Sequence, residues 1–205
     1  MEIKENIMTC AFKLFKCRGI KSVSMDNIAL ELGASKKTIY KWFENKDEIV
    51  EAALATYLTD MNLHCSQFSQ QSANAIEELF NVMGMIRQKM ASIHPSIFSD
   101  LQKYHPKAYQ LWVQHKNQVI YQNIVKNLKR GISEQLYRAD LNVEIMARLR
   151  LLQTEHAFDP EFFPPEKYDL QQVQLAILEH YMLGIATLKG HKLINKFKKV
   201  VEDDW

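Results

Sequence analysis

The stretch ASKKTIYKWFENKDEI, residues 34–49, decides which fold this chain can adopt. Its first ten residues hold three lysines, one tyrosine and one tryptophan, and an acidic run follows them. Ser35 is a favourable N-cap for a short helix over residues 36–43, in which Ile39 and Phe43 lie one turn apart on the inner face. The three lysines are therefore expected on the outer surface of this helix.

The residues just before this helix predict a helix-turn-helix. Ser24 can cap a second short helix over residues 25–32, and Gly33 ends it. Two short helices joined by a tight turn that contains glycine are typical of this motif. Ala29 supplies a small residue where the helices touch, Gly33 tolerates a positive φ, and Ile39 anchors the second helix.

The rest of the chain also shows helical periodicity. Apolar spacing predicts a first helix over residues 3–16 and a fourth, capped by Asn45, over residues 46–61. Further helices are expected over residues 74–92, 95–103, 106–135, 141–156 and 170–197. We therefore predict an all-α fold that opens with a three-helix helix-turn-helix domain.

The charge of the chain is unevenly distributed. The formal net charge is +2, which by itself does not indicate nucleic-acid binding. Residues 13–41, however, contain seven basic and two acidic residues. Outward lysines there can neutralise phosphates, and the early residues of the exposed helix can reach base edges in a major groove. The alternative is a solvated lysine face on a helical hairpin that binds a protein.

The sequence also predicts the compartment. Cys10, Cys17 and Cys65 form no CxxC pair and leave an odd count, which suits a reducing environment. The amino terminus does not resemble a signal peptide. The most apolar late segment, residues 175–188, is interrupted by Glu179 and is too short for a membrane span. We expect a cytoplasmic protein.

The sequence lacks the usual signatures of catalysis and metal binding. The seven histidines show no HExxH or paired spacing, and no second pair accompanies His64 and Cys65. No nucleophile elbow or phosphate-binding loop is present in the sequence. We therefore expect neither an enzyme nor a metal site, and no cofactor.

Residues 7–53 resemble the DNA-binding domain of the tetracycline-repressor (TetR) family of bacterial transcription regulators. Members of this family show a recognition helix of the type GVSKGTLYxYFxxKExL, and residues 33–49 read GASKKTIYKWFENKDEI. The departures are Ala34 for valine, Lys37 for glycine and Trp42 for tyrosine or histidine. Because Lys37 and Trp42 occupy positions at which relatives touch DNA, the operator sequence does not carry over.

The resemblance implies a set of DNA contacts. Ser24 would bind a phosphate through its hydroxyl and amide groups, and Lys46 would hold a second phosphate. The groove-facing residues would be Ser35, Lys36, Lys37 and Thr38, with Tyr40, Lys41 and Trp42 near the DNA backbone. For Trp42, a position in the protein core is an equal alternative.

The resemblance further implies a helix-turn-helix domain over residues 1–46 and a helical domain over residues 47–205 that binds a small effector and forms a homodimer. Apolar residues at helical spacing predict the dimer interface. They are Ile145, Leu149, Leu152, Val173, Ile177, Tyr181, Gly184 and Leu188. The alternative is that this stripe is intramolecular core.

An effector site is expected among Met and aromatic residues, since thioether side chains adapt to varied ligands. The candidates are Met61, Met83, Met90, Phe98, Trp112, His115 and Val119. Ordinary core packing is the alternative for all seven.

Together these features predict a transcription regulator that an effector releases from a roughly palindromic double-stranded DNA operator. The family resemblance favours a repressor. Two alternatives remain. One is a helical small-molecule-binding or enzymatic protein whose basic hairpin docks a protein partner, and the other is a regulator without a ligand.

Overall fold

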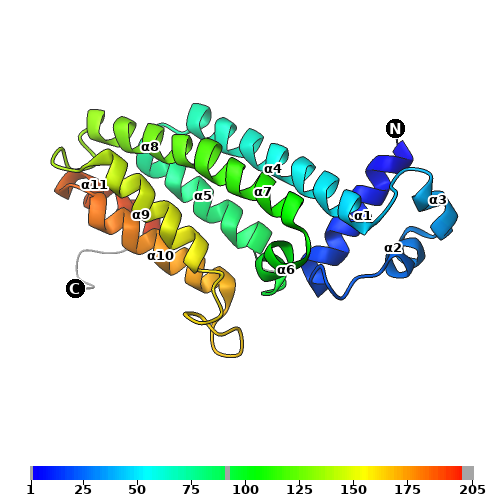
Figure 1. Cartoon of the computed structure of the whole chain (residues 1–205). Coiled ribbons are helices and arrows are strands. Elements are labelled where there is room, and N and C mark those ends of the chain that lie inside the picture. Colours follow the sequence, from blue (N-terminus) through cyan, green and yellow to red (C-terminus); the bar gives the residue numbers. More distant parts are fainter. Residues whose placement is uncertain (1, 91–92, 200–205) are drawn as a thin grey trace. The chain divides into compact units, whose positions relative to one another are not determined.

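The computed structural model describes residues 2–90 and 93–199, and the regular elements in these ranges are helices, as predicted (Figure 1). No helix in these ranges combines the length and the apolar character needed to cross a membrane. The elements are α1 (Glu2–Arg18), α2 (Met25–Leu32), α3 (Lys36–Tyr40), α4 (Lys46–Gln71), α5 (Ala75–Met90), α6 (Ile97–Tyr104), α7 (Pro106–His115), the π-helical turn η1 (Lys116–Ile120), α8 (Tyr121–Ser133), α9 (Val143–His156), α10 (Leu170–Ile185) and α11 (Leu188–Lys198).

The chain divides into two compact units. The first comprises Met1–Asn62 and Ser92–His115, and the second comprises Leu63–Ala91 and Lys116–Trp205. The first unit thus extends beyond residue 46, the predicted end of the DNA-binding domain, and takes in α6 and α7.

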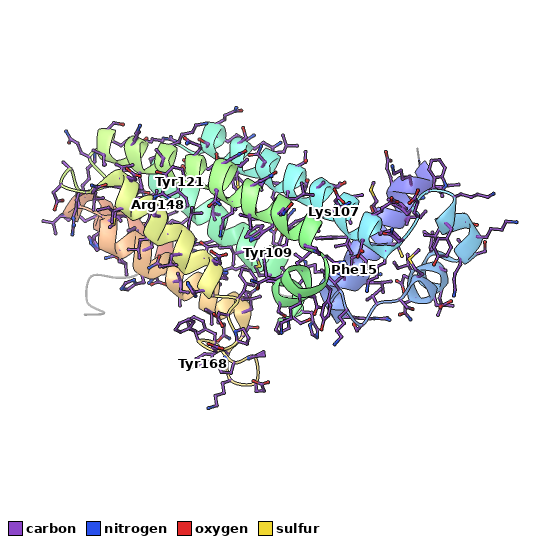
Figure 2. All side chains as sticks on the ribbon, in the orientation of Figure 1. Phe15, Lys107, Tyr109, Tyr121, Arg148 and Tyr168 are labelled. Carbon is purple, nitrogen blue, oxygen red and sulfur yellow. The ribbon has the colours of Figure 1, made fainter. Side chains whose placement is uncertain are left out.

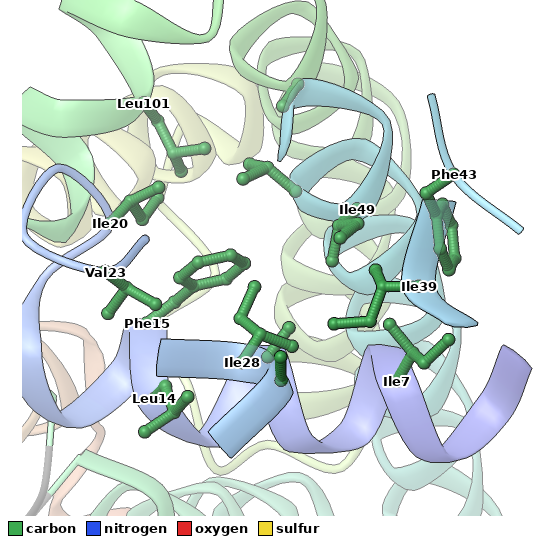
Figure 3. Packing of buried hydrophobic residues seen from close by; sticks show 14 residues of the cluster. Ile7, Leu14, Phe15, Ile20, Val23, Ile28, Ile39, Phe43, Ile49 and Leu101 are labelled. Carbon is green, nitrogen blue, oxygen red and sulfur yellow. The ribbon is translucent and has the colours of Figure 1, made fainter. Parts of the chain in front are cut away.

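Inward-facing side chains from six helices build the core of the first unit (Figure 3). They include Ile7, Leu14 and Phe15 of α1, Ile28 of α2, Ile39 of α3, Ile49 of α4 and Leu101 of α6. Each fully buried aliphatic or aromatic side chain contributes about 1.5–3 kcal/mol to folding. This shared core fixes which side of α3 faces inward and which side faces solvent.

The turn between α2 and α3 has the predicted geometry. The backbone N–H of Asn27 donates to Ser24 Oγ at 3.2 Å, and the N–H of Ser24 donates to Asn27 Oδ1 at 2.8 Å, which closes a capping box. Gly33 has a φ of 66°, in the left-handed region. Ser35 Oγ accepts the N–H of Thr38 at 3.1 Å and caps α3. The three local signals of the helix-turn-helix are therefore confirmed.

Tyr137 lies at the centre of the second unit. Its ring is almost fully buried, and its hydroxyl donates to the Ala75 carbonyl at 3.1 Å and lies 3.0 Å from Asn127 Oδ1. The amide of Asn127 also donates to the Ala75 carbonyl, at 3.0 Å. The loop after α8 is thereby fixed to the start of α5, and the buried polar groups of Tyr137 and Asn127 are satisfied.

The single helix predicted over residues 170–197 is wrong, because the structure divides it into α10 and α11. The backbone N–H of Thr187 donates to the Leu136 carbonyl at 2.9 Å, and that of Arg138 donates to the Ile185 carbonyl at 2.9 Å. Thr187 also caps α11 with its side chain. These bonds to the segment after α8 replace the intrahelical bonds that a continuous helix would make.

Other helices also differ from the predictions. The helix expected over residues 36–43 ends at Tyr40, where the N–H of Trp42 turns back to the Ile39 carbonyl. The fourth helix continues to Gln71, because no glycine or proline interrupts residues 62–71. The helix expected over residues 106–135 contains η1. The predicted end of the helix over residues 74–92 lies outside the described residues.

Candidate nucleic-acid interface

The structure separates the two faces of residues 35–43, which comprise α3 and the turn after it, as predicted. Ile39 and Phe43 are buried in the core of the first unit, whereas Ser35, Lys37 and Lys41 are exposed. Within the described residues, neither Lys37 nor Lys41 forms an ion pair. Two positive charges are thus available to an anionic partner on the outer face.

Lys36 differs from its neighbours because its charge is partly compensated. Its ammonium lies 2.7 Å from the carboxylate of Asp26 in α2, and both side chains are exposed. The hydrogen bond to Asp26, followed by the Coulombic attraction of the same group, raises the pKa of Lys36. An exposed pair of this kind is weak and screened by salt, so a phosphate can displace Asp26.

Ser24, Ser35 and Thr38 have local roles in this fold. Ser24 Oγ donates to Asn27 Oδ1 at 2.9 Å, and Ser35 Oγ lies 2.9 Å from Thr38 Oγ1. The hydroxyls that the family resemblance assigns to DNA are thus engaged in capping. Ser24 and Ser35 remain exposed and Thr38 is half-buried, so their DNA contacts stay a prediction.

Tyr40 and Trp42 both lie at the surface. Trp42 is 42% exposed, so the alternative that placed it in the core is wrong. Phe43 takes the inward position instead. Two large aromatic rings therefore flank the lysines of the outer face, where they can pack against a DNA backbone.

The structure gives Lys46 a partner within its own unit. Its ammonium donates to the Ile20 carbonyl, at the turn between α1 and α2, and lies 5.8 Å from the centre of the Phe15 ring. The pKa of Lys46 is lowered by burial, and the attraction of the buried Asp100 carboxylate only partly offsets this shift. The side chain turns toward this carbonyl and carboxylate, so we expect Lys46 to stabilise the fold, and its phosphate contact stays a prediction.

Sequence reasoning missed a polar cluster that joins the start of α6 to the turn after α1. Asp100 Oδ2 accepts the N–H of Lys21 at 2.8 Å and the hydroxyl of Ser96 at 3.1 Å. The N–H of His94 donates to the Lys16 carbonyl at 2.6 Å. Gly19 predicted a turn at this place, but nothing local pointed to partners about eighty residues away.

Gly19→Ala is expected to destabilise the first unit by about 1–3 kcal/mol. Gly19 has a φ of 78°, and a Cβ there would lie 2.6 Å from Ser96 Oγ and 3.2 Å from Asp100 Oδ2. Urea unfolding followed by tryptophan fluorescence measures the loss. Gly33→Ala is the control, because Gly33 also has a positive φ but open space around it. Equal losses in the two variants would show that the cluster imposes no constraint on Gly19.

The predicted dimer residues fall into two groups in the second unit. Ile145, Leu149 and Leu152 of α9 are 58%, 40% and 51% exposed and form one apolar stripe. Gly184 and Leu188 are also exposed, and Ile177 is half-buried. Val173 and Tyr181 are buried in the same chain, so the structure removes these two from the predicted interface. Their side of α10 packs on α5, α9 and the segment after α8 instead.

The seven predicted effector residues do not share one unit. Met61, Phe98, Trp112 and His115 belong to the first unit, and Met83, Met90 and Val119 belong to the second. The rings of Phe98 and Trp112 meet edge to face with centroids 5.1 Å apart. Within the described residues, the buried Trp112 Nε1 has no hydrogen-bond partner. Burial lowers the pKa of His115.

Met83 is part of the second unit's core, and Met61, Met90 and Val119 are half-buried. Across residues 2–90 and 93–199, no group of three or more His, Cys, Asp or Glu residues is placed to hold a metal ion.

Comparisons with known proteins agree with this geometry. Residues 7–53 match the family model described as bacterial regulatory proteins, tetR family. The uncharacterized HTH-type transcriptional regulator YvaF of Bacillus subtilis is 24% identical over 88% of this chain and 94% of its own length. The HTH-type transcriptional repressor KstR2 of Mycolicibacterium smegmatis is 22% identical over 92% of this chain and 93% of its own length.

A solved structure shares the fold over most of the chain. A TetR-family transcriptional regulator from Agrobacterium tumefaciens superposes with a TM-score of 0.74 and 16% identity, covering 90% of this chain and 97% of that one. The likeness therefore extends beyond the helix-turn-helix into the second unit.

Proposed function

We propose a repressor function for this chain, which belongs to the TetR family of DNA-binding transcriptional regulators. In this proposal, two copies bind a roughly palindromic operator, and a small effector releases them. The observation that carries the proposal is the outer face of α3 and the turn after it, where Lys37 and Lys41 stand exposed opposite the buried Ile39 and Phe43.

The outer face of α3 has the chemistry that DNA recognition requires. Lysine ammonium groups neutralise phosphates and can donate to guanine acceptors in the major groove. Lys37 and Lys41 lie four residues apart, on one side of this short segment. We infer that Lys37, near the start of α3, reaches base edges and that Lys41 and Tyr40 contact the backbone.

The exposed stripe on α9 supports the homodimer. Three large apolar side chains, Ile145, Leu149 and Leu152, recur at helical spacing and are 40% or more exposed. A second copy of α9 related by a two-fold axis would cover them. The resulting dimer would present two α3 helices to successive major grooves, about 34 Å apart along the DNA.

The polar cluster at α6 supplies a means of regulation. Asp100 accepts from Lys21 in the turn after α1, and His94 donates to the Lys16 carbonyl in the last turn of α1. Leu101 is part of the same core as Ile28 and Ile39. A displacement of α6 on effector binding would shift the turn and, through the shared core, the recognition helix. A small shift is sufficient, because two recognition helices must match one helical repeat of DNA.

We expect Lys37→Ala to weaken operator binding at least about tenfold and to relax base specificity, because one direct base contact is lost from each subunit. Fluorescence anisotropy with a labelled fragment from upstream of the chain's own gene measures the affinity. Titrations between about 50 and 200 mM salt give the number of phosphates neutralised.

Lys46→Ala and Lys36→Ala are the matched controls. Lys46→Ala should leave the salt dependence of operator binding unchanged. It should lower the folding stability of the first unit, because the Lys46 ammonium donates to the Ile20 carbonyl. Lys36→Ala should have a smaller effect than Lys37→Ala, because Asp26 already offsets its charge. If Lys46→Ala reduced the salt dependence of operator binding as much as Lys37→Ala does, the inward orientation of the Lys46 side chain would be contradicted. Binding without salt dependence would favour a protein partner for the basic face.

A further inference from the structure

The second unit buries a guanidinium that no carboxylate compensates. Arg150 of α9 is 7% exposed, and no ion pair or hydrogen bond from its guanidinium is present among the described residues. Its contact is with the ring of Tyr181 on α10, whose centroid lies 5.6 Å from the guanidinium carbon. Burying a charge without a counter-charge carries a large free-energy penalty, even after local relaxation.

Arg130 in the same unit is an arginine with a structural role, and its charge is compensated. The guanidinium of Arg130 lies 2.7 Å from Glu134 and 3.4 Å from Glu78. It also donates to the carbonyl of Ser72 at 2.7 Å. Arg150 is more deeply buried than Arg130 yet has none of these partners, so the fold alone does not account for its charge.

The polar groups around Arg150 are also unsatisfied. Gln153, one helical turn further along α9, has a buried Oε1 without a hydrogen-bond partner, and the hydroxyl of Tyr181 is buried without one. Gln174 differs, because its amide donates to the Thr154 carbonyl at 3.2 Å. Unpaired polar atoms are therefore concentrated at Arg150, Gln153 and Tyr181 within the described part of this unit.

The charge of Arg150 persists at neutral pH. Burial lowers the pKa of Arg150 to about 10, and the Coulombic effect of Tyr181 opposes this shift. Burial raises the pKa of Tyr181, with the charge of Arg150 as the opposing cause. The site therefore presents one positive charge and one neutral hydroxyl donor at pH 7.

We propose that Arg150 binds the carboxylate of an organic acid and that this acid is the effector class of the protein. The guanidinium would donate two parallel hydrogen bonds to the carboxylate, and the Tyr181 hydroxyl would donate a third. A single buried cation favours a monoanion over a phosphate dianion. The Tyr181 ring beside the guanidinium favours an apolar body on the acid. This inference rests on the proposed function.

The position of Arg150 separates this site from the predicted dimer surface. Arg150 lies about 140° around α9 from Ile145, so it faces the interior while Ile145, Leu149 and Leu152 face outward. A ligand at Arg150 would contact α9 and α10 from within the chain. It could therefore alter the arrangement of the two helices without being part of the contact between copies.

Thermal shift and calorimetry with the full-length protein test the assignment. The probes are octanoate and phenylacetate, with the neutral amides octanamide and phenylacetamide as matched controls and inorganic phosphate as the dianion. We expect at least one acid to raise the melting temperature and bind, and its amide to bind at least about tenfold more weakly, because a charge-assisted hydrogen bond is lost.

Arg150→Met is the decisive variant, since methionine approximates the buried stem without the charge. It should fold with unchanged or higher stability and lose the response to the acids, whereas an arginine with a purely structural role would lower the stability when removed. Arg148→Met is the control, because Arg148 is exposed on the same helix and lies over the Tyr121 ring at 5.4 Å (Figure 2).

Three outcomes would overturn the assignment: neither acid binds the wild type, phosphate binds as well as the acids, or Arg150→Met still responds. Operator binding without a ligand distinguishes this failure from failure of the proposed function. If wild type and Arg150→Met both bind the operator while the acids have no effect, only the ligand assignment is wrong. If an acid binds at Arg150 but no DNA binds, only the repressor function is wrong.

Discussion

Leu149→Glu is expected to convert the dimer into monomers and to weaken operator binding at least about a hundredfold, because two linked half-site contacts become independent. Leu149 lies between Ile145 and Leu152 in the exposed stripe of α9, and all three are apolar. In a two-fold interface that covers Leu149, the substitution would bury one carboxylate from each copy away from water. Light scattering coupled to gel filtration measures the mass, and anisotropy measures the DNA affinity.

Leu63→Glu provides the matched control for this prediction. Leu63 is an exposed leucine of the same unit and lies on α4, away from the stripe, so the same change of charge should leave the dimer intact. A dimer of undiminished stability in Leu149→Glu would remove the α9 stripe from the interface. A dimer that dissociates without loss of operator affinity would contradict the requirement for two recognition helices.

Gly131→Ala is expected to destabilise the second unit by about 3 kcal/mol or more, at the upper end of overpacking effects. A Cβ at Gly131 would lie 2.0 Å from Cδ2 and 2.2 Å from Cε2 of Tyr137. The ring cannot retreat, because it is buried and its hydroxyl is bonded to Ala75 and Asn127. The unfolding midpoint in urea, followed by circular dichroism, measures the loss.

Gly84→Ala supplies the comparison, since Gly84 is a helical glycine of α5 and a Cβ there would have nothing within 4 Å. Helix propensity alone predicts that glycine to alanine stabilises a helix by about 1 kcal/mol. Gly84→Ala should follow this rule and Gly131→Ala should reverse it. Stabilisation of both variants would show that the segment carrying Tyr137 adapts, and the central role of Tyr137 would then be wrong.

The helix-turn-helix was predictable from the sequence in detail. Ser24, Gly33 and Ser35 each act on neighbours within four residues, and their caps and positive φ are confirmed in the structure. The burial of Ile39 and Phe43 also followed from spacing along one helix. These features were accessible because the interactions that produce them are local.

Other parts of the candidate sites were not predictable in this way. The direction of Lys46 depends on the Ile20 carbonyl and on Asp100, which come from distant parts of the chain. Tyr181 has the same apolar spacing as a dimer residue, but its neighbours in the same chain bury it. Spacing on one helix identifies an apolar side, and it does not identify what covers that side.

The sequence by itself determined that this chain is all-α, that its second and third helices form a helix-turn-helix, and that the lysines of α3 face outward. Only the tertiary structure decided that Lys46 turns inward, that the last predicted helix breaks before Thr187, and that Arg150 is buried without a counter-charge. The physical reason is the separation along the chain between the residues that interact. Caps, turns and helical faces depend on residues within one or two helical turns. The partner of a buried charge or of a free carbonyl can come from any segment that the fold brings next to it.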